Sequence, residues 1–257
     1  MRLDFLVAEK LNISRTKAQN LIKEGKVQVA CGIVDKPSYD VDSDKNITIL
    51  QTENYVSRGA YKLVGAIEKF GLNFQNKIVL DMGASTGGFT QVCLINGASK
   101  VYSVDVGKGE LDKSLVQDKR VVNMEGQDIR TLTNEMVKGV NIIVGDLSFI
   151  SLKHILPKVF SLFGEIECAL LFKPQFECGK EVAKKYRGVI KDKVVHKKLL
   201  IDFVEELKLY NFTLSNITYS SIKGKEGNIE YLLHLNGKET KVFDISQIVD
   251  TAFKELK

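Results

Sequence analysis

The sequence predicts an α/β fold in which a mostly parallel sheet of seven strands follows a small α+β module. From Lys77 onward, short apolar runs alternate with helical patterns, as expected for parallel strands joined by crossover helices. Within that region, Ile78 to Asp81 has the composition of a strand buried on both faces, and it runs into a glycine-rich turn. The first 50 residues mix helices with short strands. We therefore expect a domain over residues 1–50, a linker over 51–58 and a second domain over 59–257.

The N-terminal module is predicted to hold two helices followed by three strands. Apolar spacing supports a first helix over residues 2–11, and Ser14 is a suitable N-cap for a second helix over 15–24 that ends at Gly25. Leu21 and Ile22 are expected to face the core. The strands are expected at 27–29, 32–34 and 47–50.

The glycine turn after Asp81 predicts a nucleotide pocket. Gly83, Gly87 and Gly88 carry no Cβ, so the backbone can turn sharply and a ligand can approach it closely. A helix that starts near Gly88 adds unpaired N–H groups. The pocket is expected at the carboxyl end of the first strand of the sheet. The alternative is a tight turn whose glycines serve packing alone.

The residues of the turn argue against a dinucleotide and favour a ligand with a cationic amino group. A dinucleotide site has the pattern G-x-G-x-x-G, but Ser85 stands where the second glycine would be. Asp81 would repel a pyrophosphate and suits a ligand with a cationic amino group. The order Asp-x-Gly-x-x-x-Gly resembles the first motif of methyltransferases that depend on S-adenosylmethionine (SAM). A nicotinamide dehydrogenase is therefore disfavoured.

Two further carboxylates fit the rest of such a ligand. Asp105 ends the strand Val101 to Asp105, 22 residues after Gly83, which is the spacing of a carboxylate that binds ribose hydroxyls. Asp128 follows the third strand, where folds of this kind often contact the adenine amine. The predicted cofactor-binding residues are Asp81, Gly83, Ser85, Gly87, Gly88, Phe89, Asp105 and Asp128.

Further strands and helices complete the expected sheet. A helix is expected to open within residues 55–63 and to reach Phe70. The last two strands are seven residues apart with Gly224 and Gly227 between them, which is hairpin spacing, so we expect the sheet to end with an antiparallel strand. The remaining strands are expected at 101–105, 121–124, 141–146, 167–173, 213–222 and 230–235, and the helices at 88–97, 112–118, 131–138, 151–163 and 194–210.

Composition sets the broad class of the protein. The chain has 257 residues, 44% of them hydrophobic, with a net charge of +5, which mildly favours an anionic partner. Its four cysteines form no C-x-x-C pair, so no zinc or redox motif is visible and free thiols are expected; they are Cys31, Cys93, Cys168 and Cys178. There is no apolar run of the roughly 20 residues that a membrane span needs, nor a signal-peptide core. We expect a soluble cytoplasmic protein with no membrane partner and no bound metal.

Positive charge is concentrated in one segment beside the expected site. Residues 173–198 hold nine Lys or Arg and three Asp or Glu. A solvated face is the ordinary explanation of such a run, but its place beside the pocket favours contact with a phosphate backbone. Pro174 is expected to stop the preceding strand and to hold an extended turn.

Taken together, these residues resemble the TlyA family, in which an S-four (S4) RNA-binding domain precedes an FtsJ-like ribose 2′-O-methyltransferase domain. The S4 resemblance rests on Arg2-Leu-Asp, Ser14-Arg15, Gly25-Lys-Val-Gln-Val29 and Lys36-Pro37-Ser38. The resemblance to the methyltransferase domain rests on Val56-Ser-Arg-Gly59, Gly145-Asp-Leu-Ser-Phe-Ile150, Lys173-Pro-Gln-Phe-Glu177 and Gly227-Asn-Ile-Glu230. Residues 53–56 depart from the family because they lack an arginine that many members carry before an aromatic residue.

The resemblance implies the activity and the residues that perform it. The fold would be a Rossmann-like seven-stranded SAM methyltransferase sheet with a small S4 domain, and the reaction would be methylation of cytidine 2′-hydroxyls in ribosomal RNA. The family's catalytic set falls on Lys62, Asp146, Lys173 and Glu230. We assign Lys173 as the general base, with Lys62 contributing positive field. The expected RNA-binding residues are Arg2, Arg15, Lys17, Lys23, Lys26, Arg58, Lys184, Lys185 and Arg187.

The partner implied is a ribosomal subunit. Shorter members of the family are thought to modify the large subunit only, and this chain resembles the short type. Many members are labelled haemolysins, so a pore-forming protein is one rival; the absence of a lytic helix weighs against it. A ribosome assembly factor that binds RNA without catalysis is another.

Overall fold

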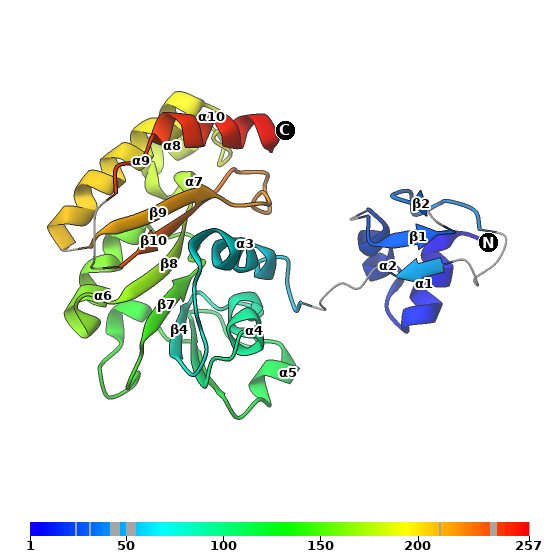
Figure 1. Ribbon diagram of the computed structural model, residues 1–257, viewed down its shortest axis with the longest axis horizontal. Helices are drawn as coiled ribbons and strands as arrows, with labels where there is room; N and C mark the ends of the chain where they lie inside the picture. Colours follow the sequence, from blue (N-terminus) through cyan, green and yellow to red (C-terminus); the bar gives the residue numbers. More distant parts are fainter. Residues whose placement is uncertain are drawn as a thin grey trace. The chain divides into compact units, whose positions relative to one another are not determined.

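The chain forms two compact units, Met1–Asn54 and Tyr55–Lys257. The computed structural model in Figure 1 describes residues 1–23, 25–30, 32–41, 47–49, 55–210, 212–236 and 241–256. Four features expected from the sequence lie outside these ranges: the ends of a helix and a strand at Glu24 and Leu50, the thiol of Cys31, and linker residues 51–54.

The first unit packs two helices on a three-stranded antiparallel sheet in the order β2-β1-β3. Its core includes Leu3 and Val7 from the first helix and Ala18 and Ile22 from the second, all fully buried. The Ser14 hydroxyl accepts a hydrogen bond from the Lys17 N–H at 3.3 Å, which confirms the predicted cap. The elements are α1 Leu3–Leu11, α2 Arg15–Lys23, β1 Val27–Val29, β2 Gly32–Ile33 and β3 Ile47–Ile49.

The second unit is built on a seven-stranded sheet in the order β6-β5-β4-β7-β8-β10-β9. The five strands from β6 to β8 are parallel, and β10 is antiparallel to both of its neighbours. The antiparallel strand therefore lies inside the sheet, between β8 and β9, and β9 forms the edge. The strands are β4 Ile78–Met82, β5 Lys100–Asp105, β6 Val121–Glu125, β7 Ile142–Gly145, β8 Glu167–Phe172, β9 Leu214–Tyr219 and β10 Tyr231–Leu235.

Helices cover both faces of this sheet (Figure 1), as the apolar strands require. Leu80 and Met82 of β4 pack in the core cluster that includes residues of α6, α9 and α10, whereas Val79 packs in the opposite cluster with α3 and α4. The helices are α3 Ala60–Phe70, α4 Gly88–Ile95, α5 Lys113–Val116, α6 Leu156–Phe163, α7 Pro174–Glu177, α8 Gly179–Lys185, α9 Lys193–Leu207 and α10 Ile245–Glu255, with short 3₁₀ turns at η2 Ile129–Thr131, η3 Leu152–His154 and η4 Lys208–Tyr210.

Two expectations for the second unit are wrong. Residues 131–138 form turns rather than a helix: the Thr131 hydroxyl donates to the Asp128 carbonyl at 2.8 Å, a local bond that competes with helix formation, and Leu132 and Val137 anchor the segment in the core. The segment after Lys173 is not extended. Pro174 begins α7, because its fixed φ and missing N–H suit the first turn of a helix.

The expected hairpin is also longer than predicted. β9 ends at Tyr219 and β10 begins at Tyr231, so the β9–β10 loop, defined here as residues 220–230, is longer than the expected connection; at its tip the Gly227 N–H donates to the Gly224 carbonyl at 2.9 Å, which closes a tight turn. A further difference is an additional helix, α10, which Asp244 caps by accepting from the Gln247 N–H at 2.9 Å. Cys93, Cys168 and Cys178 are free thiols.

Candidate active site

Four titratable side chains from distant parts of the sequence meet above the carboxyl ends of the parallel strands. Asp146 directly follows β7 and Lys173 directly follows β8, so both side chains project from the same edge of the sheet. Lys62 reaches this edge from α3, and Glu230 stands immediately before β10. The structure thus brings together the whole predicted catalytic set.

The four groups form one continuous chain of ion pairs. Lys62 Nζ lies 2.7 Å from Glu230 Oε2 and 3.3 Å from Asp146 Oδ2, and Lys173 Nζ lies 2.6 Å from Asp146 Oδ1. Lys173 also donates to the Ser148 hydroxyl at 2.8 Å, and Gln175 Nε2 donates to Glu230 Oε1 at 3.3 Å. The amines of Lys62 and Lys173 therefore each have a fixed position relative to a carboxylate.

Burial makes these interactions strong. The side chains of Lys62 and Lys173 are only 9% and 8% exposed, and that of Glu230 only 3%. Burial alone would lower the pKa of Lys62, but the carboxylates of Asp146 and Glu230 outweigh it and raise that pKa above its usual value. Lys62 is therefore held as an ammonium ion, and it is not on the solvated face that a lysine of an amphipathic helix usually occupies.

The glycine turn is shaped by close approaches of the backbone. Gly83 has φ +82°, and a Cβ there would lie 3.0 Å from the carbonyl oxygen of Asp146. A Cβ on Gly88 would lie 2.3 Å from the Ser57 hydroxyl and 2.9 Å from the backbone nitrogen of Ala60. Gly88 therefore lets α3 pack against the start of α4, in addition to lining a cavity.

A cavity of about 530 Å³ lies beside this turn, lined by Asp105 and Asp128. The two Asp105 oxygens accept the backbone N–H groups of Ser85 at 2.8 Å and Gly107 at 2.7 Å, which fixes the carboxylate while leaving lone pairs on both oxygens. Hydrogen bonds from Arg130 lower the pKa of Asp128. This cavity has the size of a small-molecule site and carries the two carboxylates predicted for a nucleoside.

Asp81 occupies a different environment from the other predicted cofactor residues. It is fully buried, Thr90 donates to its Oδ2 at 2.6 Å, and the Thr90 hydroxyl also bonds the Ser103 hydroxyl at 2.7 Å. Burial raises the pKa of Asp81 to about 7. Among the described residues that line the two cavities at this edge, Asp81 is absent, so direct contact with a ligand's amino group stays a prediction.

A second cavity, of about 520 Å³, is lined by Lys62, Asp146 and Lys173, three members of the predicted catalytic set. Gly83, Ser85, Asp146 and Ser148 line both cavities, so the two meet beside Asp146. Sequence reasoning missed several lining residues of this second cavity, and the clearest signal for them is the pair of lysines, Lys223 and Lys225, that flanks Gly224 in the β9–β10 loop. The lining residues that were not predicted as site residues are Ser57, Gly59, Ala84, Thr86, Ser148, Ile222, Lys223 and Lys225; Phe89 and Arg58, which were predicted, also line it.

The predicted RNA-binding cations fall in separate places. Lys184, Lys185 and Arg187 are exposed on and just after α8 in the second unit. In the first unit, Lys17 and Lys23 are exposed on α2, and Lys26 is half-buried.

Arg2 and Arg15 differ from those cations because both bind one buried carboxylate, that of Asp4. Arg2 Nη2 and Arg15 Nε each lie 3.0 Å from Asp4 Oδ2, and Arg15 lies over the Phe5 ring at 3.9 Å. The two guanidiniums are therefore pre-oriented.

The described part of the chain holds no group of three His, Cys, Asp or Glu side chains arranged for a metal ion. Among the described residues, no helix is long and apolar enough to span a membrane.

Comparison with known proteins gives independent information. The FtsJ-like methyltransferase family model matches residues 55–237, and the S4 domain model matches residues 1–47. A relative from Campylobacter jejuni named 23S rRNA (cytidine-2′-O)-methyltransferase TlyA is 38% identical over 91% of this chain and 98% of its own length. A relative from Mycobacterium tuberculosis named 16S/23S rRNA (cytidine-2′-O)-methyltransferase TlyA is 35% identical over 98% of this chain and 95% of its own length. A solved structure from Streptococcus thermophilus that carries a hemolysin name superposes with a TM-score of 0.75 at 35% identity, covering 99% of this chain and 96% of that one.

Proposed function

Because this chain belongs to the TlyA family of S4-containing FtsJ-like methyltransferases, we propose that it methylates the 2′-hydroxyl of a cytidine in ribosomal RNA, with SAM as the methyl donor. The observation that carries the proposal is the buried cluster of Lys62, Asp146, Lys173 and Glu230 beside a nucleoside-sized cavity. Both relatives are named for 23S rRNA, so we propose the large subunit as the target.

The residues present fit the proposed cofactor. The carboxylate of Asp105 is fixed by two backbone N–H groups and faces a cavity next to a turn in which a Cβ on Gly83 would approach a carbonyl oxygen at 3.0 Å. We assign Asp105 to the ribose hydroxyls and Asp128 to the adenine amine, with Gly83 and Ser85 where the two cavities meet. When bound, SAM supplies a methyl group made electrophilic by a sulfonium centre.

The chain's own residues must then align the ribose and remove the proton of its 2′-hydroxyl. Lys62 touches two carboxylates and stays cationic, whereas Lys173 shares one carboxylate with Lys62 and has a neutral hydroxyl, Ser148, as its other partner. We therefore assign the role of the base to Lys173 and not to Lys62. In this proposal Lys173 Nζ accepts the hydroxyl proton, Asp146 orients both amines, and Glu230 holds Lys62 in place.

The first unit is proposed to anchor the RNA. Arg2 and Arg15 offer guanidinium N–H groups that point away from Asp4, and Lys17 and Lys23 add exposed charge on α2. Support comes from the match to the S4 domain model over residues 1–47.

One experiment tests the proposed reaction directly. Purified protein is incubated with labelled SAM and with large or small ribosomal subunits from a strain that lacks the enzyme, and the RNA is digested to nucleosides. We expect one 2′-O-methylcytidine in the large-subunit RNA and none with a Lys173→Ala variant. Label in a base, or none at all from the native protein, would refute the proposal.

A further inference from the structure

The cavity over the catalytic cluster carries more positive charge than the cluster itself uses. Lys62 and Lys173 are offset by Asp146 and Glu230, to which they are paired. The lining also includes three further cations: Arg58, which was expected to bind RNA, and Lys223 and Lys225, which were not predicted. Within residues 55–210, 212–236 and 241–256, none of the three has an ion-pair partner, and Asp146 is the one carboxylate among the lining residues.

The β9–β10 loop that carries Lys223 and Lys225 is fixed in place. The Ser220 N–H donates to the Glu230 carbonyl at 2.9 Å, and the Gly224 N–H donates to the Asn228 carbonyl at 2.9 Å. The Asn228 side chain, only 2% exposed as a residue, accepts from the Ile190 N–H at 3.1 Å and donates to the Gly188 carbonyl at 2.8 Å. The loop is therefore tied to the segment that follows α8.

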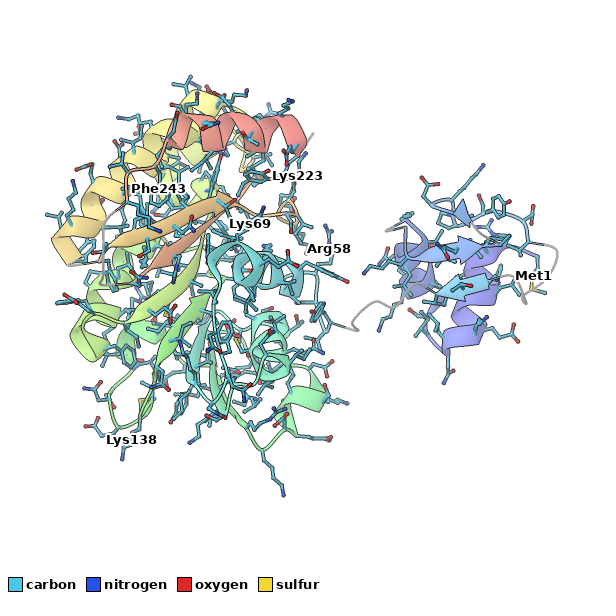
Figure 2. All side chains as sticks on the ribbon, viewed as in Figure 1. Met1, Arg58, Lys69, Lys138, Lys223 and Phe243 are labelled. Atoms are coloured by element: carbon cyan, nitrogen blue, oxygen red, sulfur yellow. The ribbon has the colours of Figure 1, made fainter. Side chains whose placement is uncertain are left out.

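The same loop lies directly against a catalytic carboxylate. A Cβ on Gly224 would lie 2.5 Å from Glu230 Oε1, so the backbone between the two lysines packs on the carboxylate that holds Lys62. The positions of Lys223 and Lys225 are thus set relative to the reaction centre. Figure 2 shows Arg58 and Lys223 at the same end of the second unit, and Lys138 at the other.

An RNA substrate would bring a phosphate group into the cavity that Lys223 and Lys225 line. The 2′-oxygen of a ribose is bonded to the carbon next to the one that bears the 3′-phosphate. A substrate that presents its 2′-hydroxyl to Lys173 must therefore bring a phosphodiester into the same cavity, within a few ångströms of that hydroxyl. Lysine and arginine side chains without carboxylate partners are the usual contacts of such a group.

We propose that Lys223 and Lys225, together with Arg58, form a subsite for the phosphate on the 3′ side of the methylated cytidine. This rests on the proposed function, because it takes the substrate to be RNA. The subsite contacts no base, so it positions the ribose without reading sequence. Holding the phosphate fixes the sugar on both sides of its 2′-oxygen, with Lys173 on one side and the loop on the other.

The test uses small probes and the full-length protein. Cytidine, cytidine 3′-monophosphate and cytidine 5′-monophosphate are titrated by calorimetry at low salt into the native protein, a K223Q/K225Q double variant and a K138Q control. Lys138 is exposed and precedes β7, at the opposite end of the strands from the site. We expect the native protein and the control to bind the 3′-monophosphate about tenfold more tightly than cytidine, and the double variant, which keeps only Arg58 of the three cations, to lose most of this preference.

Binding to ribosomal subunits gives a second measurement. Because the two lysines neutralise one phosphate, their loss should reduce the slope of log K against log salt by about 0.7–0.9, whereas K138Q should leave it unchanged. A double variant that keeps the full native preference for the 3′-monophosphate, or a native protein that prefers the 5′-monophosphate, overturns the subsite. Neither result depends on methyl transfer, so failure of the subsite is distinguishable from failure of the proposed reaction.

Discussion

At the scale of single residues, Lys62 and Lys173 share Asp146 but differ in the charge around them. Lys62 contacts two carboxylates, and Lys173 contacts one carboxylate and a serine hydroxyl. Lys62 therefore has one more neighbouring negative charge than Lys173, and charges in a buried site interact more strongly than in water. We propose that this difference assigns the role of the base to Lys173, and the pairing on which it depends could not be read from sequence.

Lys173→Ala should therefore abolish methyl transfer while leaving both ligands bound. We expect the single-turnover rate at saturating RNA to fall by about 10²–10⁴, with affinities for SAM and RNA changed only a few-fold. Lys173→Arg should not restore the rate, because a guanidinium stays protonated. A Lys173→Arg enzyme with a near-normal rate would show that Lys173 is not the base.

Asp105→Ala should weaken SAM binding about tenfold or more. Each hydrogen bond from a ribose hydroxyl to the carboxylate is worth roughly 1.5–3 kcal/mol. Calorimetry measures the affinity, and thermal unfolding shows whether the domain stays folded, since Asp105 also holds the N–H groups of Ser85 and Gly107. Unchanged affinity would remove Asp105 from the cofactor site.

Asp4→Asn separates orientation from charge in the first unit. If Arg2 and Arg15 acted only through their charge, removing the negative charge of Asp4 should strengthen RNA binding. We expect the opposite, about three- to tenfold weaker binding, because the carboxylate orients both guanidiniums. The measurement is fluorescence anisotropy with ribosomal RNA, with exposed Lys17→Gln as the control for the loss of one cation and thermal unfolding as the control for folding.

At the scale of elements, the strands and the pocket were predictable because they depend on local patterns. Continuous apolar runs identified the buried strands, and the glycines identified the turn after β4. Helix 131–138 failed because Thr131 bonds the Asp128 backbone, a local competition that hydrophobic spacing does not reveal. The capping pattern Asp244-x-x-Gln247 before an apolar face is legible in the sequence and marks α10.

The β9–β10 loop was the least predictable element, because its form depends on partners distant in sequence. Asn228 is held by backbone groups at 188 and 190, and Gly224 is required by Glu230. The motif Gly227-Asn-Ile-Glu230 contains Asn228 and Glu230, but it does not reveal which groups they contact. The two lysines of the loop therefore joined the candidate site only once the fold was known.

Gly224→Ala should reduce catalysis without unfolding the protein. Its Cβ would lie 2.5 Å from Glu230 Oε1, the end of a flexible side chain, so the carboxylate moves instead of the fold. We expect the methyl-transfer rate to fall by about ten- to a hundredfold. Gly65→Ala is the matched control: its Cβ would be 3.6 Å from the Ser221 hydroxyl, an ordinary contact in α3, and the rate should not change. A normal rate for Gly224→Ala would contradict the account of the loop.

At the scale of the whole molecule, the chain consists of two units with separate cores. The core of Met1–Asn54 includes Leu3, Val7, Ala18 and Ile22, and that of Tyr55–Lys257 lies on the two faces of the large sheet. Each unit satisfies its own hydrophobic pattern, which is why two domains could be predicted from sequence. Tyr55 to Arg58, expected in the linker, belong to the second unit.

Removing residues 1–54 should leave a folded second unit that binds SAM with native affinity. Methyl transfer to ribosomal subunits should fall by about tenfold or more, because the proposed RNA anchor of Arg2, Arg15 and α2 is lost. Calorimetry with SAM is the control for folding. Full activity of the truncated protein would show that the first unit does not anchor the RNA.

The position of β10 has a consequence for the order of events during synthesis. β10 is the last strand of the sheet to be made, yet it lies between β8 and β9, so those two strands have no shared neighbour until the ribosome has added it. Glu230 stands one residue before that strand. The glycine turn and Asp105 are complete in the nascent chain much earlier. A growing chain can thus assemble its nucleoside cavity first, and it completes the catalytic cluster only when the final strand inserts.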